Sequence, residues 1–355
     1  RKRNCEETDL HIIIAILIFG FIIIFHELGH FLTAKACNVR VNEFTLGLGP
    51  TLVSFGKGET KYCLKLLPFG GSCVMEGEDS ESDDDRAFNK KPLWQKFLIV
   101  FAGPFFNFVL AFILSMIMIG SAGYYAPTVG EVTEGYPAEK AGIAAGDEIV
   151  SIDGYPIHFY NEISIYTFFH KRSSYDVVYR HDGELKNTTI TPKYDKKLGR
   201  YLLGVVGSSD RTHPGIVGTV QYSFYEIKYQ IYVVIQSLKE LFLGHVTIND
   251  MSGPVGIVKT IGDTYKASLI DGVYYVVMNM INIAILLTAN LGVMNLLPFP
   301  ALDGGRLLIF IIEGITRKKI PEKVEAYINA VGFILLMVLM VVIMGNDIRK
   351  IIVGS

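Results

Sequence analysis

Long apolar runs separated by mixed polar segments dominate the pattern of this 355-residue chain. Three runs, about residues 10–34, 94–120 and 326–344, are uninterrupted and reach the roughly 20 residues that a helix needs to cross a bilayer. The first run is too long, and too free of a small-residue cleavage site, for a removable signal peptide. We therefore expect each run to form a membrane-spanning helix.

A fourth apolar run, third along the chain, is interrupted. It starts near Val273, breaks at Pro298 and Pro300 just before Asp303, and resumes over 307–312. Several amide side chains lie within it, namely Asn279, Asn282, Asn290 and Asn295. Backbone that leaves the helix at membrane depth must face protein or a water-filled cavity. The break is therefore a candidate functional site.

The segments between the spans also show patterns. Short alternating stretches at 129–132, 148–152, 175–179 and 187–190 predict a small β-rich domain within 127–194. Residues 220–243 mix apolar and charged positions at helical spacing, which favours an amphipathic helix at the membrane surface over a fifth span.

The loop after the first span predicts a β-hairpin. Stretches 51–55 and 61–67 alternate around Gly56, Lys57 and Gly58. The acidic run 76–85 that follows is typical of a solvated flexible loop, with a gating role as the alternative.

Composition narrows the class of protein. A mean hydropathy of +0.35 is too high for a typical soluble protein. Lys and Arg number 33 against 35 Asp and Glu, so no basic excess favours nucleic acid as a partner. Four cysteines without a CxxC pair exclude a disulfide framework and a Cys-rich zinc module. Any metal must be bound by His or carboxylate side chains.

The first span contains the motif His26-Glu27-Leu28-Gly29-His30. Ionisable groups are costly inside an apolar span. A spacing of four residues puts both imidazoles on one helical face, where they can bind one zinc ion, and Glu27 then reaches a water beside it. The alternative is that the two histidines hydrogen-bond between helices.

Zinc needs a third protein ligand, and Asp303 at the broken span is the best candidate. Glu27 and Asp303 as carboxylates would cancel the +2 charge of the ion, where an unpaired charge would be costly. The alternative for Asp303 is a turn residue in Leu-Asp-Gly-Gly. That alternative must also explain why the turn interrupts a span.

The ordered motifs of the chain, from about Phe25 to Arg306, resemble the site-2 protease family, and more narrowly its bacterial sigma-factor-regulating branch. The matching segments are His26-Glu27-Leu28-Gly29-His30, Glu43-Phe44 with Gly47-Leu48-Gly49-Pro50, Leu67-Pro68 with Gly70-Gly71, Gly103-Pro104-Phe105-Phe106-Asn107, Ser252-Gly253-Pro254-Val255-Gly256 and Asn295-Leu296-Leu297-Pro298 with Leu302-Asp303-Gly304-Gly305. One departure is Arg306, where many relatives have His.

This resemblance implies that His26, His30 and Asp303 are zinc ligands and that Glu27 is the catalytic residue. Asn107 and Asn295 match asparagines that contact the substrate backbone, although Asn107 could instead pack between helices. Residues 138–149 look like part of one PDZ domain, with peptide binding and exclusion of substrate ectodomains by size as its alternative roles. The cysteines match no catalytic position.

The implied activity is that of a zinc metalloprotease, a hydrolase that cleaves transmembrane segments of single-span substrates in regulated intramembrane proteolysis. Anti-sigma factors and remnant signal peptides are the expected substrates. The enzyme must unwind a substrate helix and supply replacement hydrogen bonds. An exposed strand edge within 61–68 could do this by β-augmentation, and Gly103-Pro104 would loosen the second span.

The expected fold is a multispan α-helical membrane protein of about four transmembrane helices, with a membrane-associated β-hairpin loop and an inserted PDZ-like α+β domain. We expect the first transmembrane helix at 8–34, the hairpin loop at 35–93, the second helix at 94–121, the PDZ-like domain at 122–208, an amphipathic helical segment at 209–271, the broken third helix at 272–316 and the fourth helix with the C-terminus at 324–355.

The expected location is the bacterial cytoplasmic membrane, with the lipid bilayer as a partner. Basic residues in the loops 35–91 and 317–323 favour the cytoplasmic side for both, although Arg1, Lys2 and Arg3 argue the other way. The active site would then lie near the cytoplasmic side and the PDZ-like domain outside the cytoplasm.

Two other classes compete with the protease. A transporter would also have broken spans, but it usually has paired repeats and more than four spans. A catalytically inactive membrane scaffold could bind partners through the PDZ-like domain. Glu27 discriminates between these readings, because binding zinc does not require it and activating water does.

Overall fold

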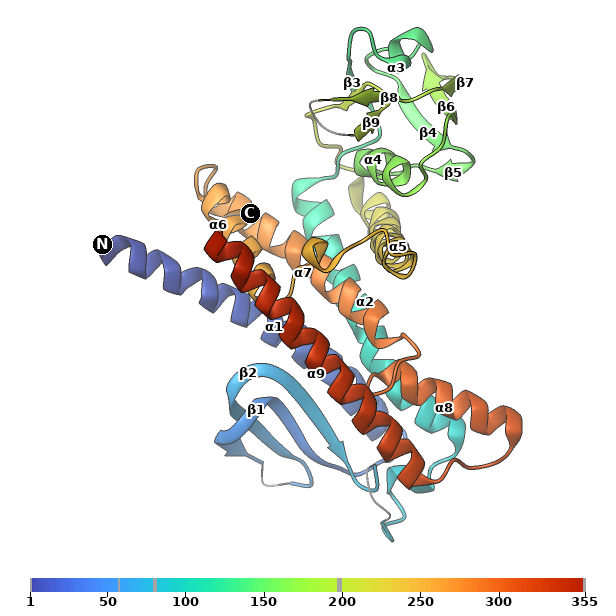
Figure 1. Ribbon diagram of the computed structural model, residues 1–355. Helices are drawn as coiled ribbons and strands as arrows, with labels where there is room; N and C mark the ends of the chain where they lie inside the picture. Colours follow the sequence, from blue (N-terminus) through green and yellow to red (C-terminus); the bar gives the residue numbers. More distant parts are fainter. Residues whose placement is uncertain (1, 57, 79–81, 197–199, 354–355) are drawn as a thin grey trace. The chain divides into compact units, whose positions relative to one another are not determined.

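The computed structural model describes residues 2–56, 58–78, 82–196 and 200–353 and divides the chain into two compact units. Unit 1 consists of Arg1–Leu114 and Leu241–Ser355, and unit 2 consists of Ser115–Glu240. Figure 1 labels the elements of both units. Helix α2 begins in unit 1 and ends in unit 2. The expected segment 209–271 is likewise divided, because its two helices belong to different units.

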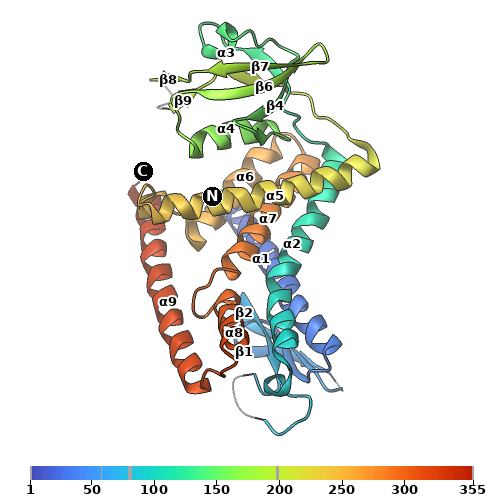
Figure 2. The same cartoon turned by 90° about the vertical axis from the view of Figure 1, so that its right-hand side faces the viewer.

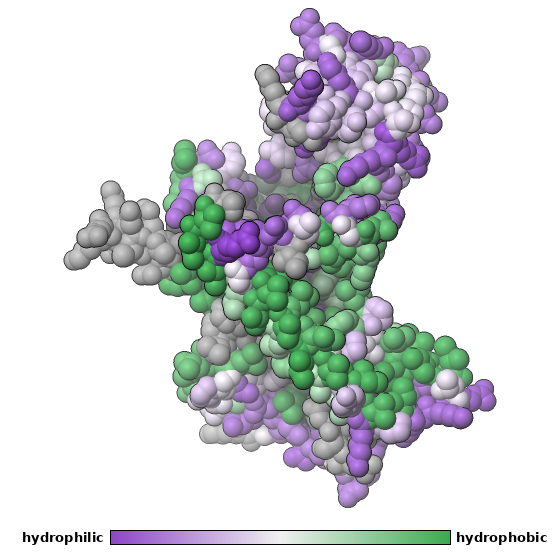
Figure 3. Space-filling view, viewed as in Figure 1, coloured by the Kyte–Doolittle hydropathy of each residue, from purple (hydrophilic) through white to green (hydrophobic). Residues whose placement is uncertain are grey.

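Among the described residues, four helices are long and apolar enough to cross a membrane. These candidate spans are Ile12–Ala36 in α1 (Lys2–Ala36), Leu93–Ala122 in α2 (Leu93–Ala122), Val273–Asn295 in α7 (Val273–Asn295) and Lys323–Val353 in α9 (Glu322–Val353). Only 6% of the apolar window of α9 is buried, and Figure 3 shows hydrophobic side chains gathered over this helix. Outward apolar side chains are what a lipid-facing helix requires.

The predicted break after the third span is present. Helix α7 ends at Asn295, and α8 (Asp303–Thr316) starts at the aspartate, earlier than the sequence pattern suggested. The connecting turn folds tightly over the start of α8. A Cβ atom at Gly304 would lie 2.2 Å from the Leu297 carbonyl oxygen, and one at Gly305 2.4 Å from that of Phe299. The paired glycines therefore let the turn close and place Asp303 at a helix start.

Strands β1 (Val41–Phe55) and β2 (Lys61–Met75) form a separate sheet in unit 1. Val53, Ser54 and Phe55 pair with Leu64, Cys63 and Tyr62, respectively. Phe44 has Cys73 and Tyr62 as partners, so the first part of β1 lies between two parts of β2. The stretch around Tyr62 is consequently paired on both sides, and the expectation of an exposed edge within 61–68 is wrong for its first part.

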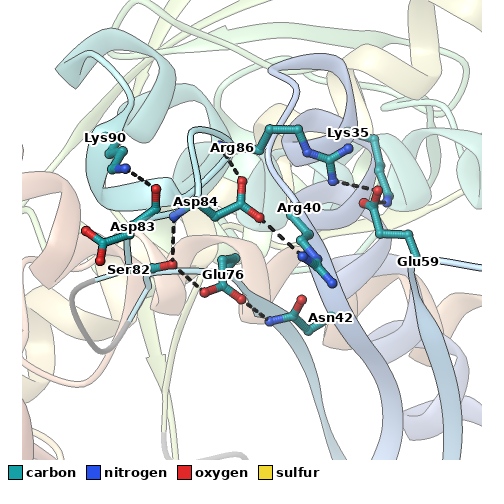
Figure 4. A network of polar contacts seen from close by, with 10 residues as sticks. All are labelled: Lys35, Arg40, Asn42, Glu59, Glu76, Ser82, Asp83, Asp84, Arg86 and Lys90. Atoms are coloured by element: carbon teal, nitrogen blue, oxygen red, sulfur yellow. Dashed lines mark hydrogen bonds and ion pairs between the residues drawn. The ribbon is translucent and has the colours of Figure 1, made fainter.

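The acidic run is held by hydrogen bonds where the structure describes it. Arg40 contacts Asp84 at 3.2 Å, and Glu76 accepts hydrogen bonds from Asn42 and Ser82 (Figure 4). Residues 79–81 of the run lie outside the described residues. Nearby, hydrogen bonds from Lys35 and Arg86 hold the pKa of Glu59 at about 2, so Lys35 ends the first span with an ion pair.

The remaining helices of unit 1 support this arrangement. Helix α6 (Pro254–Leu269) packs against α1 and α7, and the Gly256 amide donates to the buried Asp347 of α9 at 2.8 Å. Figures 1 and 2 show the start of α9 and the start of α2 at the same end of unit 1. Two short 3-10 turns complete the unit, η1 (Phe88–Lys90) and η2 (Ile248–Asp250).

Unit 2 contains the small β-rich domain that the alternating pattern predicts. Its main sheet has the order β5-β4-β6-β7, and two smaller sheets pair β10 with β3 and β8 with β9. The strands are β3 (Val129–Val132), β4 (Glu148–Ile152), β5 (Tyr155–Pro156), β6 (Tyr175–His181), β7 (Glu184–Ile190), β8 (Lys193–Asp195), β9 (Arg200–Leu202) and β10 (Val205–Gly207), and the helices between them are α3 (Pro137–Lys140) and α4 (Tyr160–Phe169). Ile149, Ile152, Val177 and Ile190 are core residues.

Helix α5 (Gly215–Phe242) has the reverse of the usual polarity for a surface helix. Its buried residues include Glu226 and Gln230, whereas Ile216, Val217 and Phe242 are more than 80% exposed. The helix packs on the β-rich domain through aromatic rings, including Tyr232 at 5.0 Å from Tyr155. Helix α5 is not one of the four candidate spans in the described part of the chain. An exposed apolar face is what an interfacial helix presents to lipid.

We predict that Glu226→Gln stabilises the protein more at pH 8 than at pH 5. Burial raises the pKa of Glu226, and the nearby Glu162 raises it further. The folded state therefore retains a proton that the unfolded state releases, so stability falls as the pH rises above the unfolded pKa of this carboxyl group. The Gln side chain can still accept the hydrogen bond from Gln230 but carries no charge.

The measurement is thermal unfolding of the purified chain at both pH values, with Glu184→Gln on an exposed part of β7 as the control. A gain of a few degrees at pH 8, shrinking at pH 5, is expected. An equal gain at both pH values would contradict the proton linkage.

Candidate metal centre

The two histidines of the first span lie on one face of α1, as their spacing predicts. Their Nε2 atoms are 3.3 Å apart, and the side chains are buried at 8% and 9% exposure. Asp303 joins them from the start of α8. Its Oδ2 atom lies 3.2 Å from Nε2 of His26 and 3.5 Å from Nε2 of His30.

These three atoms fit a divalent ion. Ligands about 2.0–2.2 Å from a tetrahedral zinc ion lie roughly 3.3–3.6 Å from one another, which matches the observed separations of 3.2, 3.3 and 3.5 Å. Asp303 Oδ2 is buried and has no hydrogen-bond partner among the residues that the structure describes. A buried carboxylate oxygen without a partner is costly, and a metal ion would satisfy it. Three protein ligands leave a fourth position for water or substrate.

Hydrogen bonds orient both imidazole rings toward this point. Nδ1 of His30 donates to the Ile99 carbonyl oxygen of α2 at 2.8 Å, which leaves its Nε2 free to bind a metal. Nδ2 of the Asn107 side-chain amide lies 3.0 Å from Nδ1 of His26. The amide has nearly the same shape after a half turn, which brings its oxygen to Nδ1; the oxygen then accepts the Nδ1 proton and leaves Nε2 of His26 free to bind a metal.

Asn107 is fully buried. Thr288 of α7 donates to its backbone carbonyl oxygen at 3.2 Å, so the residue joins α1, α2 and α7. The substrate-binding role that sequence reasoning assigned to Asn107 stays a prediction, and the structure places its side chain against the candidate ligand His26.

A cavity of about 260 Å³ borders the three ligand residues and Glu27. Its opposite wall is formed by the end of β2, from Gly71 to Met75. A Cβ atom at Gly71 would lie 2.8 Å from Cγ of Glu27, so the strand approaches the acidic side chain closely. Arg306 and Glu78 form an ion pair that also lines this cavity.

Sequence reasoning attached no consequence to Arg306. The spacing of Asp303 and Arg306 could have shown that Arg306 lies near the centre. The two residues are three positions apart on α8 and therefore share a face of the helix. Among the other expected residues, Asn295 is half-buried at the end of α7, and its side chain has no hydrogen-bond partner among the described residues. Cys37, Cys63 and Cys73 are free thiols.

Helices α1 and α2 meet at two glycines beside the ligands. A Cβ atom at Gly29 would lie 2.3 Å from the Ala102 carbonyl oxygen, and one at Gly103 would lie 2.2 Å from Nε2 of His30. Small residues allow such close helix packing in membranes. The atom that a methyl group at Gly103 would meet is the metal-binding nitrogen itself.

We predict that Gly103→Ala lowers the zinc content of the purified protein at least tenfold, because the added methyl group displaces His30 Nε2. The matched control is Gly20→Ala in α1, where nothing lies within 4 Å of the added atom. Zinc measured by elemental analysis after gel filtration tests this. Full zinc occupancy in Gly103→Ala would contradict the packing described above.

We predict that Asn107→Ala weakens zinc binding by about 10- to 100-fold, the usual effect of removing a group that orients a metal-binding histidine. Competition with a chelator measures the affinity, and Asn282→Ala, at an exposed position of α7, is the control. Unchanged zinc affinity with lost cleavage would instead support the substrate-binding role.

Comparison with known proteins shows the family of the chain. Residues 14–339 match the model of peptidase family M50. A protein of Clostridium acetobutylicum named "Putative zinc metalloprotease" is 40% identical over 338 residues, covering 95% of this chain and 97% of that protein. Zinc metalloprotease RasP of Geobacillus kaustophilus is 29% identical over 425 residues, covering 97% of this chain and 99% of that protein.

Among solved structures, the PDZ domain of an SdrC-like protein from Listeria innocua matches 25% of this chain and 98% of that domain, with 25% identity and a TM-score of 0.21. The family match spans the ligand residues of α1 and α8 and the helices between them. This chain belongs to peptidase family M50, the family of the site-2 proteases.

Proposed function

We propose that the protein is a zinc-dependent intramembrane endopeptidase that cleaves transmembrane segments of single-span substrates. The observation that carries this proposal is the position of the centre. Two of its three ligands, and the acid between them, lie within a helix that is long and apolar enough to cross a membrane. The family membership and the names of the relatives support a zinc peptidase.

His26, His30 and Asp303 would hold the ion, which when bound supplies a Lewis acid that acidifies water and polarises a carbonyl group. Glu27 lines the same cavity as these ligands. Its carboxylate takes the proton from the attacking water and later passes it to the leaving amine. Asn107 and the Ile99 carbonyl group hold the two rings in place.

The end of β2 is the element best placed to receive an unwound substrate. Residues 71–75 pair with β1 on one side, and this stretch lines the cavity beside Glu27. A substrate segment that adds to its other side would replace its lost helical hydrogen bonds with backbone pairing. We place this β-augmentation at 71–75, next to the ligands, in place of the stretch around Tyr62.

Anti-sigma factors and remnant signal peptides are the substrate classes we propose, on the resemblance to the sigma-factor-regulating branch. We place the protein in the bacterial cytoplasmic membrane, with the centre near the cytoplasmic side. The β-rich part of unit 2 would act as a PDZ-like domain outside the cytoplasm, where it binds peptide or excludes folded substrate ectodomains. An inactive scaffold remains the alternative, and the next experiment separates the two.

Glu27→Gln is expected to retain about one zinc per chain and to lose cleavage of a single-span reporter by at least 100-fold, as loss of a general base predicts. Zinc content and cleavage are measured on the same detergent-solubilised samples. Glu184→Gln, at an exposed position of β7 in unit 2, is the control and should match the parent. Cleavage that survives Glu27→Gln would contradict the role of Glu27 as the base, and a parent that binds zinc but cleaves nothing would favour the scaffold.

A further inference from the structure

A second cavity, of about 810 Å³, lies in unit 1 and contains none of the metal ligands. Its volume falls in the range of sites that bind small molecules. The lining comes from the segment just before α2, the first turns of α2, the second half of α8 and the turn that leads to α9. It shares only the pair of Glu78 and Arg306 with the cavity at the metal centre.

Positive charge predominates in this cavity. Seven Lys or Arg side chains line it against four Asp or Glu side chains. Arg317, Lys318 and Lys319 are consecutive and exposed, and within the described part of the chain none of them has an acidic group within 4.0 Å. Lys91, in the segment before α2, also lines this cavity. Among the described residues it has no ion pair. The excess charge therefore has no partner within the described protein.

The basic triplet is held in a defined turn. Helix α8 ends at Arg317 in the left-handed conformation, with φ of 55°, and the Arg317 amide donates to the Glu313 carbonyl oxygen at 2.8 Å. The Glu313 side chain accepts the Ile320 amide at 2.7 Å. One residue thus ties down both ends of the turn, so the three cations project from fixed backbone.

The cavity also lies where two candidate spans begin. Leu93, the first residue of one span, and Glu325, close to the start of the span Lys323–Val353, both line it. Exposed apolar side chains follow two of its lining residues in the sequence, with Trp94 after Leu93 at 61% and Ile315 after Gly314 at 78%. Its surroundings therefore combine cations with apolar surface at the depth where a membrane changes from headgroups to hydrocarbon.

We infer that this cavity binds the phosphate headgroup of an anionic phospholipid. Arg317, Lys318 and Lys319 contact the phosphate with Lys91 opposite, and the acyl chains run along the exposed apolar surface near Trp94. Basic pockets between helices at the membrane boundary are suited to such headgroups. A free anion would use only the cations, whereas a phospholipid also uses the adjoining apolar residues.

The chain has a single tryptophan, Trp94, which directly follows the lining residue Leu93 in the sequence. The full-length protein is reconstituted in phosphatidylcholine vesicles that contain a small fraction of phosphatidylglycerol with brominated acyl chains, and quenching of Trp94 fluorescence is measured. Brominated phosphatidylcholine at the same fraction gives the baseline. We expect stronger quenching by brominated phosphatidylglycerol, and a weaker preference at high salt.

The triple variant Arg317→Gln, Lys318→Gln, Lys319→Gln should lose at least tenfold in this preference, since each cation near an anionic surface contributes a factor of about five. The matched control removes three exposed lysines of unit 2, Lys140, Lys171 and Lys186. Circular dichroism checks that both variants are folded.

Equal quenching by the two lipids in the parent protein would overturn the proposal, as would an unchanged preference in the triple variant. Inorganic phosphate forms the second arm of the experiment. If millimolar phosphate abolishes the preference, the cavity binds free anions and the lipid assignment is wrong.

Discussion

The close approach of α1 and α2 is the constraint on which the metal centre depends. At Gly29 and Gly103 the two helices leave no room for a methyl group. This proximity brings the Ile99 carbonyl oxygen within hydrogen-bonding distance of His30 and brings Asn107 to His26. Both contacts orient the rings so that their Nε2 atoms face one another across the site. A larger separation of the helices would leave two histidines in an apolar environment without partners.

The break between α7 and α8 accommodates the carboxylate of Asp303. A carboxylate inside an apolar helix bundle needs both positive charge and hydrogen-bond donors. Asp303, at the start of α8, lies close to the two imidazoles of α1. Its Oδ2 atom has no hydrogen-bond partner in the described part of the chain, as expected of a residue arranged for an ion. With zinc bound, Glu27 and Asp303 balance its charge. The same turn, closed by two glycines, is therefore both the interruption of the span and the source of its third ligand.

Polar side chains of α5 and α8 also lie where other groups can interact with them. Glu226 and Gln230 of α5 are buried in unit 2, while apolar residues at both ends of that helix, such as Val217 and Phe242, are exposed. The two ends of α8 also differ in character. Its start carries Asp303 at the metal centre, and its end carries the basic triplet at the second cavity. One short helix thus contributes to a buried anionic site and to an exposed cationic one.

The sequence by itself determined the local elements and named the residues of the candidate centre. Hydropathy located the spans, because length and apolarity are properties of contiguous residues. The spacing of His26 and His30 placed them on one face, because residues four positions apart in a helix lie on the same side. The proposed role of Asp303 combined the broken span with a charge argument and a family resemblance, and the structure brings its carboxylate to the histidines.

Only the tertiary structure decided the role of groups that meet across large sequence separations. The Asn107 side chain contacts His26, 81 residues away, and Arg306 pairs with Glu78, 228 residues away. The interior position of Tyr62 in its sheet depends on how β1 and β2 bend, which alternation alone does not encode. The second cavity likewise joins Lys91 to the end of α8. Such contacts depend on helix packing, in which many weak interactions act together, and no single motif in the sequence represents them.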